Sequence, residues 1–167
     1  MSRRKILPDS DVLAEARRLF LADGEKALSF GNLSRATGLA ASTLAQRFAT
    51  VEGLQAAAAR AGWQAMIAET DAADLSAAGK GPQGYLKALD ARAAQALLTL
   101  GARDPEAGRM AQEWRGRVET ALALRLGQAD GARAAARVLF AAWQGQGLWD
   151  PAGAEPLRLK DLAKRLA

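Results

Sequence analysis

Apolar residues recur at helical spacing near the start of the chain. Residues 11–23 place apolar side chains at the i, i+4, i+7 and i+8 positions of one helix face. Either Asp9 or Ser10 is a suitable N-cap for this helix, and Gly24 is suited to end it. The positions expected to face the core are Val12, Ala16, Leu19 and Phe20.

Two short helices and one long helix are predicted next. Ser29 is expected to cap the first short helix, and Thr37 with Gly38 to turn the chain into the second, residues 38–48. Thr50 is expected to cap the long helix, which extends to about Ala73.

The two short helices have helix-turn-helix spacing. The small Ser34 lets two helices cross closely, and Gly38, four residues later, supplies a left-handed turn. Leu33 is the apolar position before Ser34, and Leu39 and Leu44 close the wedge between the helices. This part of the chain is therefore predicted to be a three-helix unit that continues into a long fourth helix.

The rest of the chain also has helical periodicity. A connector rich in Gly and Ala covers residues 74–84, and no segment shows the alternation of a strand. Half of the residues are apolar but only 5% are aromatic, so the core is expected to consist of closely packed Ala and Leu. The fold class is therefore all-α, with further helices predicted at residues 85–104, 106–127, 129–145 and 156–167.

Composition limits the chemistry of the chain. It contains no Cys and no His, which removes disulfides, thiol nucleophiles, Cys/His zinc sites and histidine general bases. No two carboxylates are placed so that they would meet in one site. We therefore expect that the protein is not an enzyme and that it binds neither a metal ion nor a cofactor. Neither a signal peptide nor a membrane span is recognisable, and a cytoplasmic protein is expected. The net charge of +5 fits a nucleic-acid partner and fits ordinary solubility equally well.

Residues 10–61 resemble the N-terminal domain of TetR-family transcriptional regulators. The third helix of that family commonly reads like GVSKGTLYHYF and is followed by a short xSKExL turn into a long helix. The helix-one pattern VLAEARRLFLADG also matches. The resemblance implies an all-helical ligand-binding and dimerising domain after the DNA-binding one. The residues that match the two quoted motifs are Gly38, Leu39, Thr43, Leu44 and Phe48, and then Thr50, Glu52 and Leu54.

The chain also departs from the family at positions that contact DNA. Ala45 and Arg47 replace an aromatic pair, and Ala41 and Val51 stand where lysines often contact phosphate. Ala40 replaces the serine that caps the third helix. Phosphate contacts supply much of the affinity for DNA, so these changes predict weakened binding or its loss.

Candidate DNA contacts follow from the third helix and from the N terminus. Gln46 and Arg47 are the predicted base readers, because Gln pairs with adenine and Arg with guanine. Ser42, Thr43 and Thr50 are the predicted phosphate contacts. A basic N-terminal arm is expected to reach the backbone or minor groove, and it consists of Arg3, Arg4 and Lys5.

Large apolar side chains in the second part of the chain define a candidate ligand pocket. Met and Trp side chains suit a cavity that accommodates small apolar or aromatic ligands of different shapes. Each of these residues could equally well fill the protein core. The candidate set is Trp63, Met66, Tyr85, Leu89, Met110, Trp114 and Trp143. The alanine-rich segment 132–143 is a candidate dimer face, and packing within one chain is an equally good interpretation.

Together these features predict a homodimeric, TetR-like transcriptional regulator. Residues 1–50 would bind operator DNA, and residues 51–167 would bind the ligand and dimerise. The alternative is a degenerate protein on the same fold that acts through protein partners or a ligand without reading DNA. No membrane partner is expected.

Overall fold

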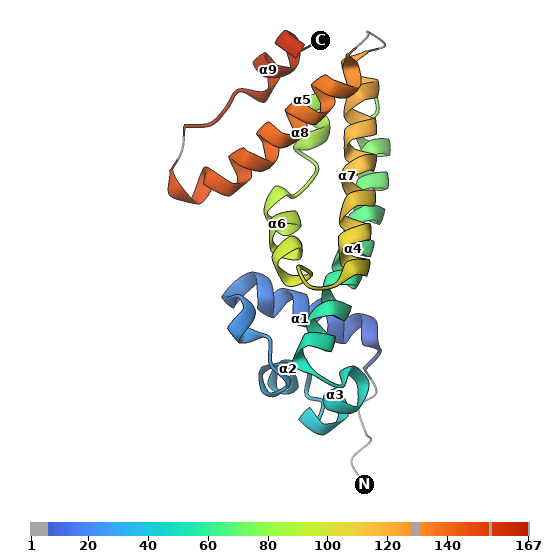
Figure 1. Cartoon of the computed structure of the whole chain (residues 1–167), viewed down its shortest axis with the longest axis vertical. Helices are drawn as coiled ribbons and strands as arrows, with labels where there is room; N and C mark the ends of the chain where they lie inside the picture. The colour runs from blue at the N-terminus through green and yellow to red at the C-terminus, as the bar shows by residue number, and fades with distance from the viewer. Residues whose placement is uncertain (1–6, 128–130, 154, 167) are drawn as a thin grey trace. The chain divides into compact units, whose positions relative to one another are not determined.

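The computed structural model describes residues 7–127, 131–153 and 155–166. These residues form nine α-helices and two short 3₁₀ helices, and no strand, as the periodicity predicts (Figure 1). None of the helices in this described part is both long and apolar enough to cross a membrane. The α-helices are α1 (Asp9–Asp23), α2 (Phe30–Thr37), α3 (Ala41–Phe48), α4 (Val51–Ser76), α5 (Pro82–Leu86), α6 (Ala91–Leu100), α7 (Pro105–Leu126), α8 (Ala132–Trp149) and α9 (Leu159–Leu166). The 3₁₀ helices are η1 (Glu25–Ala27) and η2 (Asp150–Ala152).

The contacts between residues divide the chain into two compact units. Unit 1 consists of the described residues up to Gln64 together with Ala96–Met110. Unit 2 consists of Ala65–Gln95 and the described residues from Ala111 onward. The units therefore do not coincide with continuous stretches of sequence, because α4, α6 and α7 each contribute residues to both.

Unit 1 contains the predicted helix-turn-helix, in which α2 packs against both α1 and α3. Val12 and Ala16 of α1, Leu33 of α2 and Leu44 of α3 have no exposed surface. Leu19, predicted for the same buried face of α1, is only half-buried. The three helices thus share one small apolar core, which holds α3 in place through its inward face.

The turn between α2 and α3 forms as its residues predict. Gly38 adopts a left-handed conformation, with φ of 74°. The Ser34 hydroxyl donates a hydrogen bond to the carbonyl of Leu39 at 2.6 Å. The buried Thr37 hydroxyl donates to the Leu33 carbonyl at 2.7 Å and accepts from the Leu39 amide at 3.3 Å. These bonds satisfy polar groups in the turn and fix the direction in which α3 leaves it.

Two of the predicted helix caps are confirmed and one is wrong. Ser29 accepts a hydrogen bond from the Asn32 amide, and Thr50 accepts one from the Gly53 amide. α1 begins earlier than expected: Asp9 already lies in the helix, Pro8 is the N-cap, and no side chain caps this end. The extended backbone of Pro8 is compatible with a helix start, and Asp9 still lies in the positive first turn of the helix dipole.

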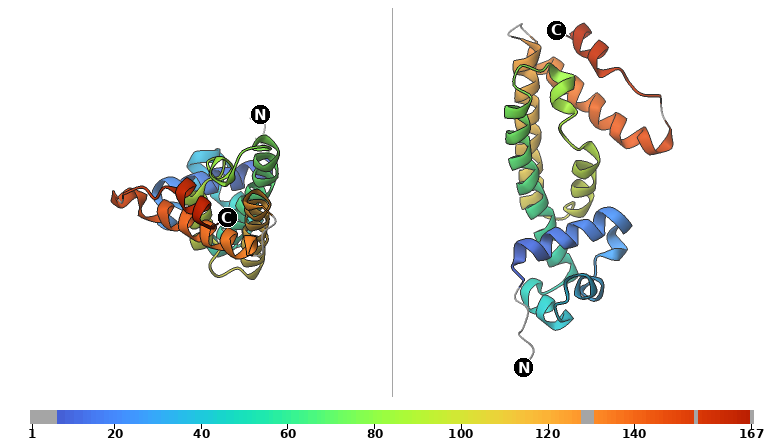
Figure 2. Two further views of the ribbon diagram at one scale, coloured as in Figure 1. Left: turned by 90° about the horizontal axis from the view of Figure 1, so that it is seen from above. Right: turned by 180° about the vertical axis from the view of Figure 1, so that it is seen from behind.

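In unit 2, α4 and α7 run side by side (Figures 1 and 2). Arg117 of α7 donates to both carboxylate oxygens of Asp71 in α4, at 2.9 Å each. Further along, Arg125 donates to the Asp74 carboxylate at 2.6 Å. The indole nitrogen of Trp114 donates to the Thr70 hydroxyl at 2.9 Å, so a buried hydrogen bond also joins the two helices.

The predicted helix 85–104 is interrupted: α5 begins at Pro82, inside the predicted connector, and ends at Leu86, and a separate helix, α6, covers Ala91–Leu100. The carboxylate of Asp90 accepts hydrogen bonds from the amides of Arg92 and Ala93, at 2.9 and 3.0 Å. Asp90 is therefore the N-cap of a new helix and does not lie on the surface of a continuous one. α4 extends to Ser76 and α8 to Trp149, each beyond its predicted end.

Candidate nucleic-acid interface

The outer face of α3 carries uncharged polar side chains. Ser42 and Gln46 are exposed, and Thr43 between them is half-buried. Leu44 points the opposite way and is fully buried. α3 thus presents a hydroxyl group and a carboxamide to solvent from a helix whose inner face is fixed. Such groups form hydrogen bonds with base edges and with phosphates.

The N terminus of α3 has no side-chain cap. Ala40 occupies the N-cap position and provides no side-chain oxygen to the first turn. The first amides of a helix have no partner within the helix, and they favour negatively charged groups such as phosphates. An N-cap serine would accept a hydrogen bond from one of these backbone amides. Because Ala40 cannot, the first turn of α3 keeps an amide donor that can bind an anion.

The connection from α3 to α4 is very tight. Ala49 has a φ of 61°, which is uncommon for a residue other than glycine. The Thr50 amide donates to the Phe48 carbonyl at 2.7 Å, and the Thr50 hydroxyl oxygen accepts from the Gly53 amide at 3.0 Å. Capping uses the oxygen of this hydroxyl as an acceptor, so its hydrogen remains available to a phosphate.

Arg47, the second predicted base reader, contacts the start of α1. Its Nη1 atom donates to the Leu7 carbonyl at 2.7 Å and to a carboxylate oxygen of Asp9 at 3.0 Å. Only 25% of the Arg47 side chain is exposed. In this conformation its guanidinium group is engaged within the protein. The sequence reasoning did not consider Asp9 as its partner, and the 38 residues between them leave no local signal for this pairing.

The described part of the helix-turn-helix has no net charge. Residues 7–50 contain five carboxylates and five basic side chains, so they provide no net attraction to phosphate. Glu15 pairs with Arg18, and this pairing lowers the pKa of Glu15 through a hydrogen bond. The predicted basic arm, Arg3, Arg4 and Lys5, lies outside the described residues.

The predicted ligand residues are divided between the two units. Trp63 and Met110 belong to unit 1, where Trp63 is buried and Met110 half-buried. The other five belong to unit 2 and are buried except for Leu89, which is half-buried. Trp114 and Trp143 lie near each other, with ring centroids 6.3 Å apart. The unit 2 members are Met66, Tyr85, Leu89, Trp114 and Trp143.

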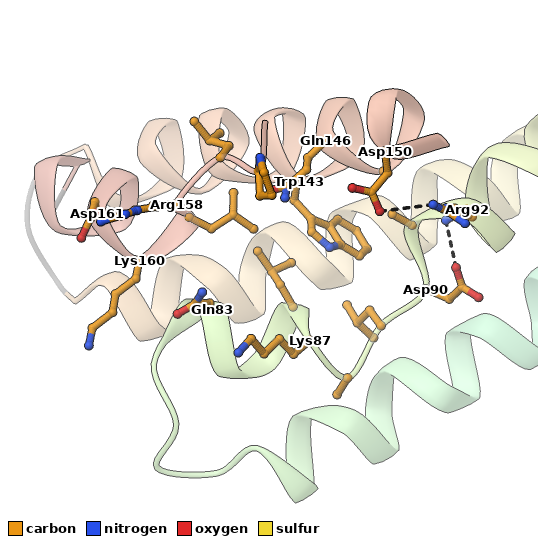
Figure 3. A pocket seen from close by; sticks show the side chains of 18 of the residues that line it. Gln83, Lys87, Asp90, Arg92, Trp143, Gln146, Asp150, Arg158, Lys160 and Asp161 are labelled. Carbon is orange, nitrogen blue, oxygen red and sulfur yellow. Dashed lines mark hydrogen bonds and ion pairs between the residues drawn. The ribbon is translucent and has the colours of Figure 1, made fainter. Parts of the chain in front are cut away.

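Unit 2 contains a pocket of about 980 Å³ that two of these residues line, Leu89 and Trp143. Figure 3 shows Trp143 pointing from α8 into this pocket, with Lys87 on the opposite side. An ion pair between Arg92 and Asp150, 3.2 Å apart, lies at one end. The lining is thus partly apolar and partly charged. Sequence reasoning missed the charged members, because they come from segments that are far apart along the chain: α4, the stretch from Lys87 to Arg92, η2 and the stretch from Arg158 to Asp161.

Tyr85 is fully buried in unit 2 and lies beneath a guanidinium group. The Arg125 guanidinium carbon is 4.4 Å from the centre of its ring, and its hydroxyl has no hydrogen-bond partner among the described residues. Burial, reinforced by the nearby charge of Asp74, raises the pKa of Tyr85 to about 12. Tyr85 is therefore neutral throughout the physiological range. No group of three or more carboxylates in the described residues is arranged to hold a metal ion.

Comparison with known proteins finds structural similarity only. No family model and no curated protein matches the sequence. The TetR-family regulator PfmR from Thermus thermophilus is 20% identical, with a TM-score of 0.55 over 92% of this chain and 93% of that one. SCO4454, a TetR-family regulator from Streptomyces coelicolor, is 16% identical, with a TM-score of 0.57 over 95% of this chain and 83% of that one. SCO7518, a candidate transcriptional regulator from Streptomyces coelicolor A3(2), is 21% identical, with a TM-score of 0.62 over 96% and 97%.

These matches extend over nearly the whole of each chain, beyond the helix-turn-helix. The resemblance noted in the sequence therefore extends in three dimensions to the second part of the molecule, where sequence similarity is too weak to detect. The chain has the fold of the TetR-family transcriptional regulators.

Proposed function

We propose that this protein is a transcriptional regulator that binds operator DNA through α3. The observation that carries the proposal is the exposed polar face of α3, with Ser42 and Gln46 outward and Leu44 fully buried behind them. A helix held in this way enters a major groove as a rigid unit. Gln46 is the proposed base reader, and Ser42, Thr43 and Thr50 are the proposed phosphate contacts.

The regulator is proposed to act as a homodimer. One α3 helix covers only a few base pairs, whereas two related by a twofold axis read two half-sites about one helical turn apart. A small molecule bound in the pocket that Leu89 and Trp143 line is proposed to modulate DNA binding. Such a ligand acts only through a difference in its affinity for the two states of the dimer. The mixed lining favours a ligand with both an apolar body and a polar group.

The test is a selection of binding sites from random duplexes, followed by titration of the best one. We expect an enriched, twofold-symmetric sequence. Replacing Gln46 by Ala should weaken binding to it by about 1–3 kcal/mol and relax the preference at one base pair of each half-site. The matched control is Gln64→Ala, which removes an exposed glutamine from α4 and should leave the affinity unchanged.

A different result would replace the proposal with its alternative. If no sequence is enriched, and Gln46→Ala binds every duplex as weakly as the wild type does, then α3 is not a reader. The protein would then be an interaction protein that uses the same fold without reading DNA.

A further inference from the structure

We propose that unit 2 has a second ligand site, between the start of α5, the end of α7 and one face of α9, which binds a small carboxylate with an apolar body. The site is separate from the pocket that Leu89 and Trp143 line. It involves unit 2 alone, so it does not depend on the proposed DNA binding by α3.

The site is a pocket of about 370 Å³. This volume lies near the lower end of the range for small-molecule sites, so the pocket fits only a small ligand. Gln83 and Lys160 line both this pocket and the larger one of about 980 Å³. Figure 3 shows these two residues at the end of the larger pocket away from Asp150. The smaller pocket therefore adjoins the larger one at that end.

The charged side chains that line the smaller pocket all have the same sign. They are Arg125, Lys160 and Lys164, and no carboxylate of the described residues lines it. The larger pocket differs in this respect, because four carboxylates and four cations line it. A hollow with charges of one sign attracts ions of the opposite sign. The expected ligand of the smaller pocket is therefore an anion.

Arg125 is a mostly buried cation whose position is fixed by its other contacts. Only 12% of its side chain is exposed. Its Nη1 atom donates to the Asp74 carboxylate at 2.6 Å and to the Ala121 carbonyl at 3.0 Å. Asp74 offsets its charge but does not line the smaller pocket; it lines a different hollow between α4 and α7. Arg125 is thus held in place before a ligand arrives, which lowers the entropic cost of binding.

Lys160 and Lys164 supply the charge that has no partner. They lie one turn apart on α9, both are exposed, and neither forms an ion pair within the described part of the chain. Two cations at this spacing destabilise a helix, and Lys160 also lies in the first turn, where the helix dipole disfavours a positive charge. An anion bound between the two ammonium groups would relieve this repulsion.

The uncharged part of the lining indicates the rest of the ligand. Pro82, Leu126 and Ala163 provide apolar surface, and the carboxamide of Gln83 provides hydrogen-bond donors. A bare inorganic anion would leave the apolar surface uncovered, whereas the hydrocarbon part of an organic acid would cover it. The lining therefore favours a monocarboxylate over inorganic phosphate.

Calorimetric titration of the full chain tests the class of ligand. The carboxylate probes are butanoate, hexanoate and octanoate, and the comparison probes are hexanol, hexylammonium and inorganic phosphate. We expect at least one carboxylate to bind more tightly than all three comparison probes, with an affinity that falls as salt is added. Equal binding of hexanoate and hexanol, equal binding of hexanoate and phosphate, or no binding of any carboxylate would overturn the proposal.

Lys164→Gln locates the bound carboxylate, because Lys164 lines the smaller pocket and not the larger one. The loss of one charge-assisted hydrogen bond should weaken binding by about tenfold. Arg165→Gln is the matched control, since it removes the same charge from the same turn of α9 at a residue that lines neither pocket. Lys87→Gln alters the larger pocket alone. Both of these variants should keep the affinity of the wild type.

Two results would overturn this location. A loss of affinity in Lys87→Gln, with none in Lys164→Gln, would place the carboxylate in the larger pocket. Equal losses in Lys164→Gln and Arg165→Gln would mean that the net charge of α9 attracts the anion without a defined site.

Amide hydrogen exchange provides a second readout. A carboxylate that bridges α9 to α5 and α7 should slow exchange in α9, and Lys164→Gln should reduce this protection. Unchanged exchange in α9 at saturating carboxylate would contradict the proposed contact. None of these measurements uses DNA, so a failure of α3 to bind an operator would reject the proposed function and leave this site unaffected.

Discussion

At the scale of single residues, a few side chains determine how firmly α3 is held. Leu44 has no exposed surface, although its neighbours Ser42 and Gln46 are exposed. A helix of only eight residues has little stability of its own in water. The burial of Leu44 therefore matters more for the position of α3 than the helix propensity of its sequence.

Leu44→Ala is expected to destabilise the protein by about 2–5 kcal/mol, since it removes a fully buried side chain and leaves a cavity. Chemical denaturation followed by circular dichroism measures the loss. Leu21→Ala is the control, because Leu21 in α1 is 49% exposed and should cost much less. Equal losses for the two variants would contradict the assigned burial of Leu44.

A second prediction concerns Tyr85, the one tyrosine of the chain. Its raised pKa means that the folded state favours the neutral hydroxyl. Stability should therefore be unaffected below about pH 10, the ordinary pKa of tyrosine, and should fall as pH rises toward the folded pKa of about 12. Absorbance at the tyrosinate band should give a midpoint near 12 in the native protein and near 10 in denaturant. A native midpoint near 10, with helicity intact, would be inconsistent with this burial.

At the scale of elements, the junction between α3 and α4 limits how α3 is oriented. α4 begins three residues after the end of α3, and the turn requires a positive φ at Ala49. A Cβ atom at Gly53 would lie 2.3 Å from the carbonyl oxygen of Phe48. The first turn of α4 can approach α3 this closely only because residue 53 has no side chain.

Gly53→Ala is therefore expected to destabilise the junction, although alanine normally favours a helix by about 1 kcal/mol over glycine. The matched control is Gly108→Ala in α7, where a Cβ atom would meet nothing within 4 Å. Thermal unfolding should show a lower Tm for Gly53→Ala and an equal or higher Tm for Gly108→Ala. A stabilised Gly53→Ala variant would refute the close approach.

At the scale of the whole molecule, the helix α8 has two apolar faces. Ala136, Leu139, Phe140 and Trp143 are buried within unit 2. Ala134, Val138, Ala141 and Leu148 are exposed and recur at spacings of four, three and seven residues, as in helices that pair. The second face is a candidate for the predicted dimer contact, and small residues on it allow close approach of a second helix.

Val138→Arg is expected to convert a dimer into a monomer. A twofold axis through this face of α8 would bring the two new cations close to each other within an apolar contact. Light scattering should then give the 17.6-kDa mass of one chain for this variant and twice that mass for the wild type. Leu98→Arg, at an exposed apolar site on α6, should remain dimeric. A monomeric wild type would reject the dimer and weaken the DNA-binding proposal.

Features that depend on near neighbours could be predicted from the amino-acid sequence. Ser29 and Thr50 cap their helices, and Gly38 makes its left-handed turn, through contacts within three or four residues. The break at Asp90 also had a local signal, since aspartate is a favoured N-cap, but the apolar periodicity on either side of it masked the break.

Contacts between residues that are distant in the sequence could not be predicted, because they depend on how the helices pack. Arg47 could not be paired with Asp9 and Leu7 from spacing, because its partner depends on how α1 packs beside α3. In the same way, the seven aromatic and apolar ligand candidates look alike in the sequence, yet packing divides them between two units. Periodicity reports which face of a helix is apolar, but the neighbour of that face is set by the packing of segments tens of residues apart.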